Sequence, residues 1–236
     1  MSIQVTNLTK TYGSQRAVDG ISFSLKKGEI VGFLGPNGAG KSTTMKILTG
    51  YLKPSSGQAS VSEHDVVQSP MPARRAIGYL PEHNPLYLDM FVTEFLLFSG
   101  KLYGMSGKAL QARVEDVITM CGLEAEKRKK IAQLSKGYRQ RVGLAQSFLH
   151  DPSVLILDEP TTGLDPNQIQ EIREVIRSAG QNKTVLFSTH IMQEVEALCD
   201  RVIIINKGKV VSDSTLNQLR ATGESLESIF RNLTSL

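Results

Sequence analysis

Long apolar runs are missing from this sequence, and its first residues lack the pattern of a secretory signal. A membrane-spanning helix needs about 20 consecutive apolar residues. The longest runs here have the length of Val154–Leu157 and Val202–Ile205, and residues 1–10 do not form a signal peptide. The chain is therefore expected to be soluble, or to reach a membrane only through a partner.

Cysteine is also scarce, which excludes a disulfide-stapled scaffold. Cys121 and Cys199 lie far apart in the sequence, in helix-like context, and are expected to be buried, reduced thiols. No grouping of histidine and cysteine has the spacing of a zinc site. Three of the four histidines, His64, His83 and His150, have no setting that suggests chemistry and are expected at the surface.

Charge of one sign is not in large excess, because 27 basic residues face 23 acidic ones and the net charge is only +4. No nucleic-acid partner is expected from so mild an excess. The one dense basic run, 127–130, is interpreted either as a solvated loop or as a contact with anionic lipid headgroups or nucleic acid. At 236 residues, with 40% hydrophobic residues, the chain can bury a hydrophobic core that needs no disulfides or structural metals.

Hydrophobic periodicity predicts an α/β fold with a mainly parallel sheet. Residues 1–30 alternate apolar and polar, which indicates an N-terminal antiparallel β part. Buried strands are predicted at 30–34, 154–157, 185–188 and 202–205. Helices are predicted at 42–48, at 93–121 with a break at 104–107, at 137–150 and around 169–176. Because strands alternate with helices, a parallel sheet follows.

A phosphate-binding loop follows the first apolar strand. Its nine residues are Gly35, Pro36, Asn37, Gly38, Ala39, Gly40, Lys41, Ser42 and Thr43. They fit the pattern G-x-x-x-x-G-K-[ST], in which glycines let backbone N–H groups surround phosphate oxygens. The lysine of this pattern reaches the β and γ phosphates and the serine hydroxyl binds Mg²⁺. The chain is therefore predicted to have the core of a P-loop NTPase.

Two acidic residues end a later strand at the place where a Mg²⁺ ligand is needed. Asp158 follows the apolar run 154–157 and can hold Mg²⁺ through water. Glu159 comes next and can orient or deprotonate an attacking water. His190 follows the next predicted strand, where a sensor of the γ-phosphate belongs. Glu159, His190 and Lys41 are the predicted catalytic residues.

A second anion site is predicted at the segment 134–138, which lies twenty residues before the acidic pair. Ser135, the N–H of Gly137 and the start of a helix can bind an anion together. One chain has no obvious use of its own for this second site.

These elements together resemble the nucleotide-binding domain of ATP-binding-cassette (ABC) transporters, over essentially the whole chain. Tyr12 matches the aromatic residue that stacks on adenine, a contact worth about 1–3 kcal/mol. Ser135 and Gly137 match the signature motif. Gly163–Asp165 match the loop that passes between two subunits, and His190 matches the switch histidine.

The resemblance implies an ATPase that uses ATP and Mg²⁺ and works as a head-to-tail homodimer, with the signature of each copy closing over the nucleotide of the other. It also implies a membrane permease as partner, docked on the surface 82–103, and a cytoplasmic location on the inner face of a bacterial membrane. The motifs at 78–82 and 188–194 resemble the exporter branch with separate permeases. The gliding-motility-associated ATPase is the nearest resemblance within it.

The same resemblance implies one ABC ATPase domain over residues 1–236. The nucleotide-binding core is predicted at 1–90 and 151–220, and an inserted helical subdomain with the signature at 91–150. A closing helix is predicted at 221–236, because four apolar residues fall on one helical face. These are Leu226, Ile229, Phe230 and Leu233.

Three positions depart from the family pattern. Glu82 stands where the family places glutamine; it can still contact Mg²⁺-bound water, and we expect its charge to tune hydrolysis. Lys136 and Tyr138 replace the usual glycine and glutamine of the signature. Lys136 is either a cation beside the partner's nucleotide or a solvated lysine, and Tyr138 can pack at the dimer seam.

Two other functions compete with that of a transporter ATPase. A soluble ABC ATPase that acts on a macromolecular complex is the alternative, although such proteins usually carry two cassettes or a long coiled-coil insertion. A P-loop kinase or GTPase is disfavoured, because the guanine-reading pattern Asn-Lys-x-Asp does not occur.

Overall fold

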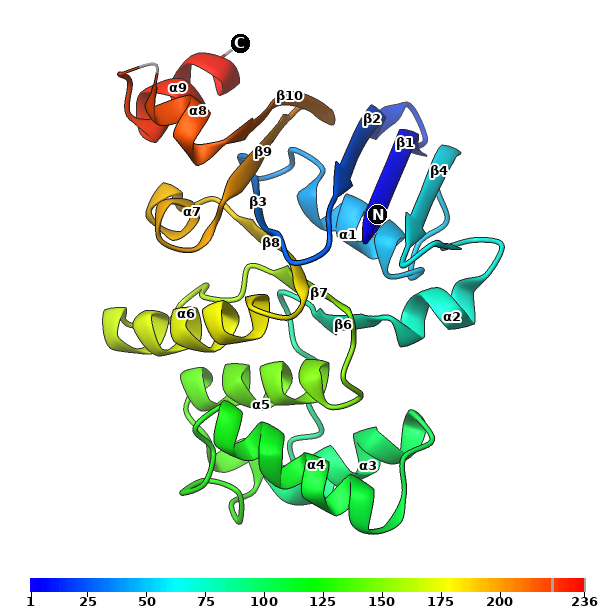
Figure 1. Cartoon of the computed structure of the whole chain (residues 1–236), viewed down its shortest axis with the longest axis vertical. Coiled ribbons are helices and arrows are strands. Elements are labelled where there is room, and N and C mark those ends of the chain that lie inside the picture. The colour runs from blue at the N-terminus through cyan, green and yellow to red at the C-terminus, as the bar shows by residue number, and fades with distance from the viewer. Residues whose placement is uncertain (222, 236) are drawn as a thin grey trace.

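Two β-sheets form the centre of the computed structural model, which describes residues 1–221 and 223–235 (Figure 1). The first sheet is antiparallel, in the order β2-β1-β4-β5. Its strands are β1 (Ile3–Tyr12), β2 (Gln15–Leu25), β4 (Ser56–Val61) and β5 (His64–Asp65). The predicted N-terminal antiparallel part is therefore confirmed.

The second sheet has the order β10-β9-β3-β8-β7-β6 and is parallel except at β10. Its strands are β3 (Ile30–Leu34), β6 (Ile77–Leu80), β7 (Val154–Asp158), β8 (Thr184–Thr189), β9 (Arg201–Asn206) and β10 (Lys209–Thr215). The four predicted buried strands are all present. The two edge strands, β6 and β10, were not predicted, because β6 is short and contains glycine and β10 alternates half-buried with exposed residues.

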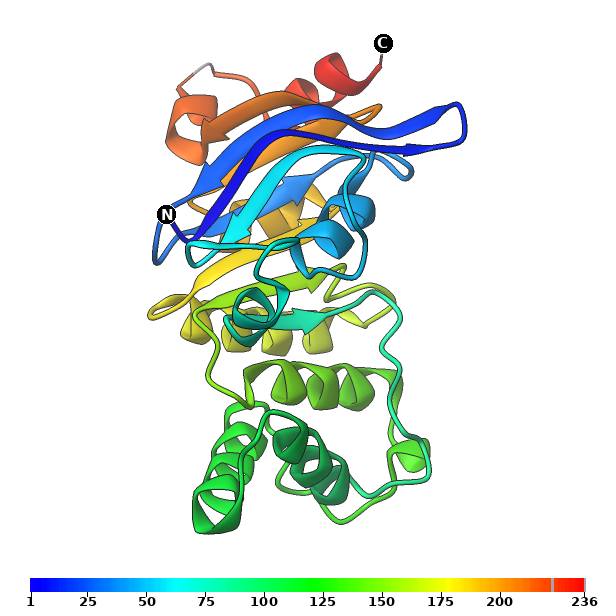
Figure 2. The ribbon, with the colours of Figure 1, turned by 90° about the vertical axis from the view of Figure 1, so that its right-hand side faces the viewer.

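Helices cover both faces of this second sheet and extend beyond it (Figures 1 and 2). They are α1 (Lys41–Leu48), α2 (Pro70–Arg75), α3 (Val92–Leu102), α4 (Gly107–Met120), α5 (Lys136–Phe148), α6 (Pro166–Gly180), α7 (Met192–Leu198), α8 (Leu216–Arg220) and α9 (Leu226–Thr234), with a 3₁₀ turn at Ile131–Gln133. Figure 2 shows α3, α4 and α5 together at one end of the molecule and α8 and α9 at the other. The predicted helical insertion is thus present.

Successive residues of the central strands point into two different cores, as the two-residue period of a strand requires. Ile156 packs in the core shared with the antiparallel sheet and α1. Its neighbours Leu155 and Leu157 pack in the core shared with α3 to α7. Because both faces are covered, these strands are continuous apolar runs, and polar groups can lie only at strand ends.

The closing helix is α9, which begins after Ser225, whose Oγ accepts a hydrogen bond from the N–H of Ser228. Leu226 is buried, and three other apolar residues of its face pack against the same core: Ile229, Phe230 and Leu233. The predicted apolar face of this helix is confirmed. Residues 222 and 236 of the predicted segment 221–236 lie outside the described residues.

His150 is half-buried and packed against neighbours, so the prediction of an ordinary surface residue was wrong. Its ring stacks on Tyr103 with centroids 3.8 Å apart, and its Nε2 lies 2.9 Å from the carbonyl oxygen of Ile77. Burial lowers the pKa of His150. The cause is tertiary, since the end of α5 packs over β6. Both cysteines are buried and free, as expected, and burial raises the pKa of Cys121 to about 12.

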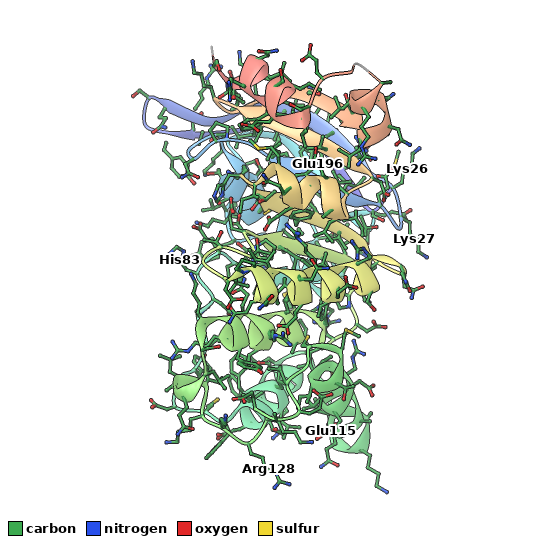
Figure 3. All side chains as sticks on the ribbon, turned by 90° about the vertical axis from the view of Figure 1, so that its left-hand side faces the viewer. Lys26, Lys27, His83, Glu115, Arg128 and Glu196 are labelled. Carbon is green, nitrogen blue, oxygen red and sulfur yellow. The ribbon has the colours of Figure 1, made fainter. Side chains whose placement is uncertain are left out.

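The basic run 127–130 lies in a loop near α3 and α4. Lys127 Nζ is 2.7 Å from a carboxylate oxygen of Glu115, and Lys129 Nζ is 2.9 Å from one of Glu126. Figure 3 shows Arg128 and Glu115 at the end of the molecule formed by these helices. Half of the run is therefore paired with acidic residues of the same chain, which supports the interpretation as a solvated loop.

Replacing Phe148 by alanine should destabilise the fold strongly. Phe148 ends α5 and is fully buried in the core that includes Leu80 of β6, so the change removes packing between the helical end and the sheet. We expect the free energy of unfolding to fall by about 3–5 kcal/mol in urea titrations. The matched control is Phe91→Ala, since Phe91 is 45% exposed. Equal decreases in the free energy of unfolding for the two variants would contradict the buried position of Phe148.

Candidate functional site

The predicted phosphate loop joins β3 to α1 and is held tightly between neighbouring strands. A Cβ at Gly35 would overlap the backbone carbonyl oxygen of Ile205 in β9, and one at Gly40 would overlap that of Ala17 in β2. Gly40 also has a φ of 107°, which L side chains rarely adopt. Glycine is therefore required at both ends of the loop.

Lys41 is buried at the start of α1 and points back into this loop. Its Nζ donates to the carbonyl oxygens of Gly35, at 2.7 Å, and Pro36, at 3.3 Å, and lies 3.7 Å from Oε1 of Glu159. Burial lowers the pKa of Lys41, and the carboxylates of Glu159 and Asp158 oppose that shift. The ammonium thus bridges the loop and the acidic pair.

Asp158 ends β7 and is almost fully buried. Its Oδ1 accepts hydrogen bonds from the hydroxyls of Ser188, at 2.5 Å, and Ser42, at 3.2 Å. Burial raises the pKa of the Asp158 carboxyl, and repulsion from Glu82 and Glu159 adds to it, whereas the two hydroxyl donors oppose it. An added cation here would be stabilised by this excess of negative charge.

The donors around Asp158 fit a magnesium ion. Hydroxyl and carboxylate oxygens from Ser42, Asp158 and Glu82 are hard ligands. Within residues 1–221 and 223–235 there is no group of three His, Cys, Asp or Glu that could hold a metal by itself. Mg²⁺ usually takes only one or two carboxylates and shares the rest of its shell with water and phosphate, so such a group is not needed.

Glu159 follows Asp158 in a strained backbone conformation, with a φ of 51°. Its Oε2 lies 2.9 Å from Nδ1 of His190 and accepts a hydrogen bond of 3.2 Å from the hydroxyl of Thr162. Its backbone N–H donates to the hydroxyl of Ser188. The structure therefore brings the predicted residues Glu159, His190 and Lys41 together, at the carboxyl ends of β7 and β8.

A cavity of about 460 Å³, here called the phosphate-loop cavity, opens beside these groups. It is lined by Tyr12, Gln15, Ala17, residues 37–43, Glu82 and Glu159. Tyr12 is half exposed at its rim, with the ammonium of Lys10 5.3 Å from the ring centroid. Most of the residues predicted to bind nucleotide or Mg²⁺ thus lie around one space.

Ser135 and Gly137 lie elsewhere, at the start of α5. Ser135 is exposed, and its Oγ accepts a hydrogen bond from the N–H of Tyr138. Gly137 packs against the side chain of Gln168. Among the described residues, the lining of the phosphate-loop cavity includes neither Ser135 nor Gly137.

Several residues of the site were missed from the sequence. Ser188 holds both Asp158 and Glu159, and its place at the end of the predicted strand 185–188 was a usable signal. Thr162 had no such signal, because only the folded turn places its hydroxyl on Glu159. Gln140 of α5 donates to the carbonyl oxygen of Pro160 at 2.8 Å, which ties the helix to the turn after the acidic pair.

A family model described as "ABC transporter" matches residues 18–162, which include the phosphate loop, the start of α5 and the acidic pair. The chain belongs to the ABC transporter family. It is accordingly an ATP-binding subunit and an ATPase of this family.

Relatives at 40% identity support this assignment. The bacitracin transport ATP-binding protein of Bacillus licheniformis is 40% identical over 220 residues, covering 92% of this chain and 71% of the relative. The ABC transporter ATP-binding protein NatA of Bacillus subtilis is 40% identical over 219 residues, covering 91% and 89%. Neither is named for gliding motility, so that narrower resemblance stays a prediction.

Solved structures share the whole fold. The ATP-binding subunit of an ABC transporter is similar with a TM-score of 0.89, at 32% identity over 99% of both chains. A dimeric ATP-binding cassette in a post-hydrolysis state, bound to ADP and Pi, has a TM-score of 0.83 at 27% identity, over 91% of this chain and 98% of that one. In the described part of this chain, no helix has the length and apolar character needed to span a membrane.

Replacing Asp158 by asparagine should stabilise the protein when nucleotide and Mg²⁺ are absent. Burial raises the pKa of this carboxyl, so the folded state binds its proton more tightly than the unfolded chain does. The free energy of unfolding therefore falls as the pH rises from the ordinary aspartate pKa of 3.8 through the higher pKa of the folded state. We expect a higher Tm for the variant at pH 7, by roughly 2–4 °C for each kcal/mol that the substitution adds to the free energy of unfolding.

The difference in Tm should narrow as the pH falls toward the ordinary aspartate value of 3.8. The matched control is Asp116→Asn, at an exposed position of α4, which should not change the Tm. A Tm for Asp158→Asn at or below that of the unmodified chain at pH 7 would count against a destabilising buried carboxylate.

Proposed function

We propose that this chain is the ATPase subunit of an exporter: two copies close head to tail on ATP and Mg²⁺, and their opening and closing drive a separate membrane permease. One observation carries the proposal. Ser135, at the start of α5, is exposed, and neither Ser135 nor the buried Gly137 is among the described residues that line the phosphate-loop cavity with Lys41 and Glu159. A complete nucleotide site then needs the phosphate-loop cavity of one copy and the Ser135 segment of a second copy.

Residue roles follow from the positions around the cavity. Tyr12 stacks on adenine at the rim, and the backbone N–H groups of residues 37–43 surround the phosphates. Ser42 and Glu82 of this cavity, together with Asp158 beside Ser42, would hold Mg²⁺, which would neutralise phosphate charge. Glu159 orients or deprotonates the attacking water.

Binding of phosphate requires Lys41 to change partners. Its ammonium is now shared between the carbonyl oxygens of the loop and Glu159, and a phosphate oxygen offers a stronger, charged acceptor. Once Lys41 turns to phosphate, Glu159 keeps the contacts to His190 and Thr162. The carboxylate is then free of its ammonium partner and can accept a hydrogen bond from water.

The donated half of the site lies on a helix long enough to present a positive N-terminal end, since α5 spans Lys136–Phe148. Ser135 caps this helix, and its hydroxyl can turn to a phosphate of the partner's nucleotide. The side chain of Lys136 lies over Gly163 of the same chain, where it adds positive charge beside the loop that faces the partner.

The permease partner is assigned to the surface 82–103. A second cavity, the tyrosine cavity, has a volume of about 500 Å³ and lies there; its lining includes Tyr51, Tyr79, Glu82, His83 and Tyr103. Four large apolar residues of the segment 82–103 are exposed: Tyr87, Leu88, Phe91 and Leu102. Such exposed apolar surface favours docking on a protein partner, and we assign it to the permease, on the inner face of the cell membrane.

The exporter role is supported by what similar proteins are named for. These names include bacitracin transport, linearmycin resistance and Nod factor export. The alternative of a soluble ABC ATPase that acts on a macromolecular complex gains no support from these relatives, and two of the four cations of the basic run 127–130, Lys127 and Lys129, are already paired with carboxylates of the same chain.

Changing Glu159 to glutamine should trap the ATP-bound pair. The amide cannot take a proton from water but keeps the shape of the side chain, so ATP binding persists while the hydrolysis rate falls by about 100- to 10,000-fold. Dimer formation with ATP is followed by light scattering, and hydrolysis by phosphate release. The control is Glu124→Gln, at an exposed position. A Glu159→Gln chain that hydrolyses ATP normally would contradict the base assignment.

Mixing two inactive variants should restore activity in part. Lys41→Ala and Ser135→Ala homodimers each lack an intact site, whereas a heterodimer has one, so a mixture should reach at most about a quarter of the unmodified rate if chains pair at random. Phosphate release is measured for the mixture and for each variant alone. A mixture no faster than its components, or one with full activity, would contradict donation of Ser135 to the partner's site.

A further inference from the structure

Glu194 is a buried carboxylate that the proposed chemistry leaves without a role. It lies on α7 and is only 1% exposed. Both of its oxygens accept hydrogen bonds from hydroxyls: Oε1 from Thr161 and Oε2 from Thr189, the latter at 2.6 Å. Because a buried carboxylate is costly unless its oxygens are satisfied, these two contacts fix the positions of all three side chains.

The two hydroxyls come from two different turns, and each turn carries a proposed catalytic group. Thr161 is two residues after Glu159, in the turn that leaves β7. Thr189 ends β8 and directly precedes His190, and its hydroxyl also accepts the N–H of Ile191. Glu194 therefore connects the backbone that carries Glu159 to the backbone that carries His190.

Thr161 is tightly connected to Glu159. The N–H of Thr162 donates to the carbonyl oxygen of Glu159, and the N–H of Leu164 donates to that of Thr161. This compact turn starts from the positive φ of Glu159, a conformation that persists only when the surroundings enforce it. Holding Thr161 in place therefore helps to hold Glu159 as well.

The direct contact between Glu159 and His190 differs from this buried bridge. The His190 side chain is 47% exposed, and Glu159 lines the phosphate-loop cavity, so both can exchange partners with water or phosphate. Neither Glu194 nor Thr161 is among the described residues that line this cavity. The bridge can therefore persist while the exposed side chains change partners.

We propose that Glu194 is a positioning residue for the ATPase reaction: its buried carboxylate bridges the hydroxyls of Thr161 and Thr189 and so keeps the Glu159 and His190 turns at a fixed separation. This inference rests on the proposed function, since it takes Glu159 and His190 as the groups that act on water and phosphate. Glu194 itself contacts no substrate.

Thr161→Val is the sharpest test, because valine keeps the shape of threonine and loses only the hydroxyl. We expect kcat to fall by about 10- to 100-fold, the effect of a small misplacement of a catalytic group. KM and the affinity for ATP should stay within about twofold, since the bridge does not touch the nucleotide. Thr161→Ser restores the hydroxyl and should keep kcat close to that of the unmodified chain.

Glu194→Ala removes the bridge from its other side. Its kcat should fall to a similar level, and the double variant with Thr161→Val should lose little more, because both changes break the same contact. The matched control is Glu196→Gln, two residues along the same helix, at an exposed position labelled in Figure 3. All assays are run well below the Tm of each variant, measured in parallel.

Several outcomes would overturn the proposed positioning role of Glu194. These are a normal kcat in Thr161→Val, an equal loss in Thr161→Ser, an equal loss in Glu196→Gln, or losses of kcat and ATP affinity that follow the Tm, as a purely structural role predicts. If the unmodified chain itself fails to hydrolyse ATP, the proposed function fails instead, so the two failures are distinguishable.

Discussion

The attraction between the Lys41 ammonium and the carboxylates of Asp158 and Glu159 is the interaction on which the rest of the site depends. All three side chains are buried, and a buried charge is tolerated only when other groups balance it. The parallel sheet provides the place, because its strands are apolar on both faces and leave only their ends for charge. The loop around Lys41, the hydroxyls of Ser42 and Ser188, and the cavity beside them all follow from this arrangement.

The exposed half of the site is connected to the buried half within one chain. Gln140 of α5 donates to the carbonyl of Pro160, and Gly137 packs on Gln168 of α6. Asp165 caps α6 by accepting two backbone N–H groups. The helix that presents Ser135 and the turn that follows Glu159 therefore form one packed unit. In the proposed head-to-tail dimer, a nucleotide of the partner bound at α5 would in this way influence the position of Glu159.

Sequence patterns were sufficient where a local rule applies. The glycines at 35 and 40, the apolar strands and the acidic pair each follow from backbone geometry or from a two-residue period, so they were predicted from the residues alone. The edge strands β6 and β10 were missed, because a short strand with glycine and a half-exposed strand have weak patterns. His150 was misplaced, because its partners Tyr103 and Ile77 are 47 and 73 positions away in the sequence.

The sequence by itself determined the chemical groups of this ATPase: the phosphate loop, the acidic pair and the serine and glycine of the signature, since each depends on a few neighbouring residues. The tertiary structure alone decided which of them meet. Only folding joins Lys41 to Glu159, and it also leaves Ser135 outside their cavity. The physical reason is that buried charges and hydroxyls find their partners across strands, so the contacts are set by the order of the strands in the sheet.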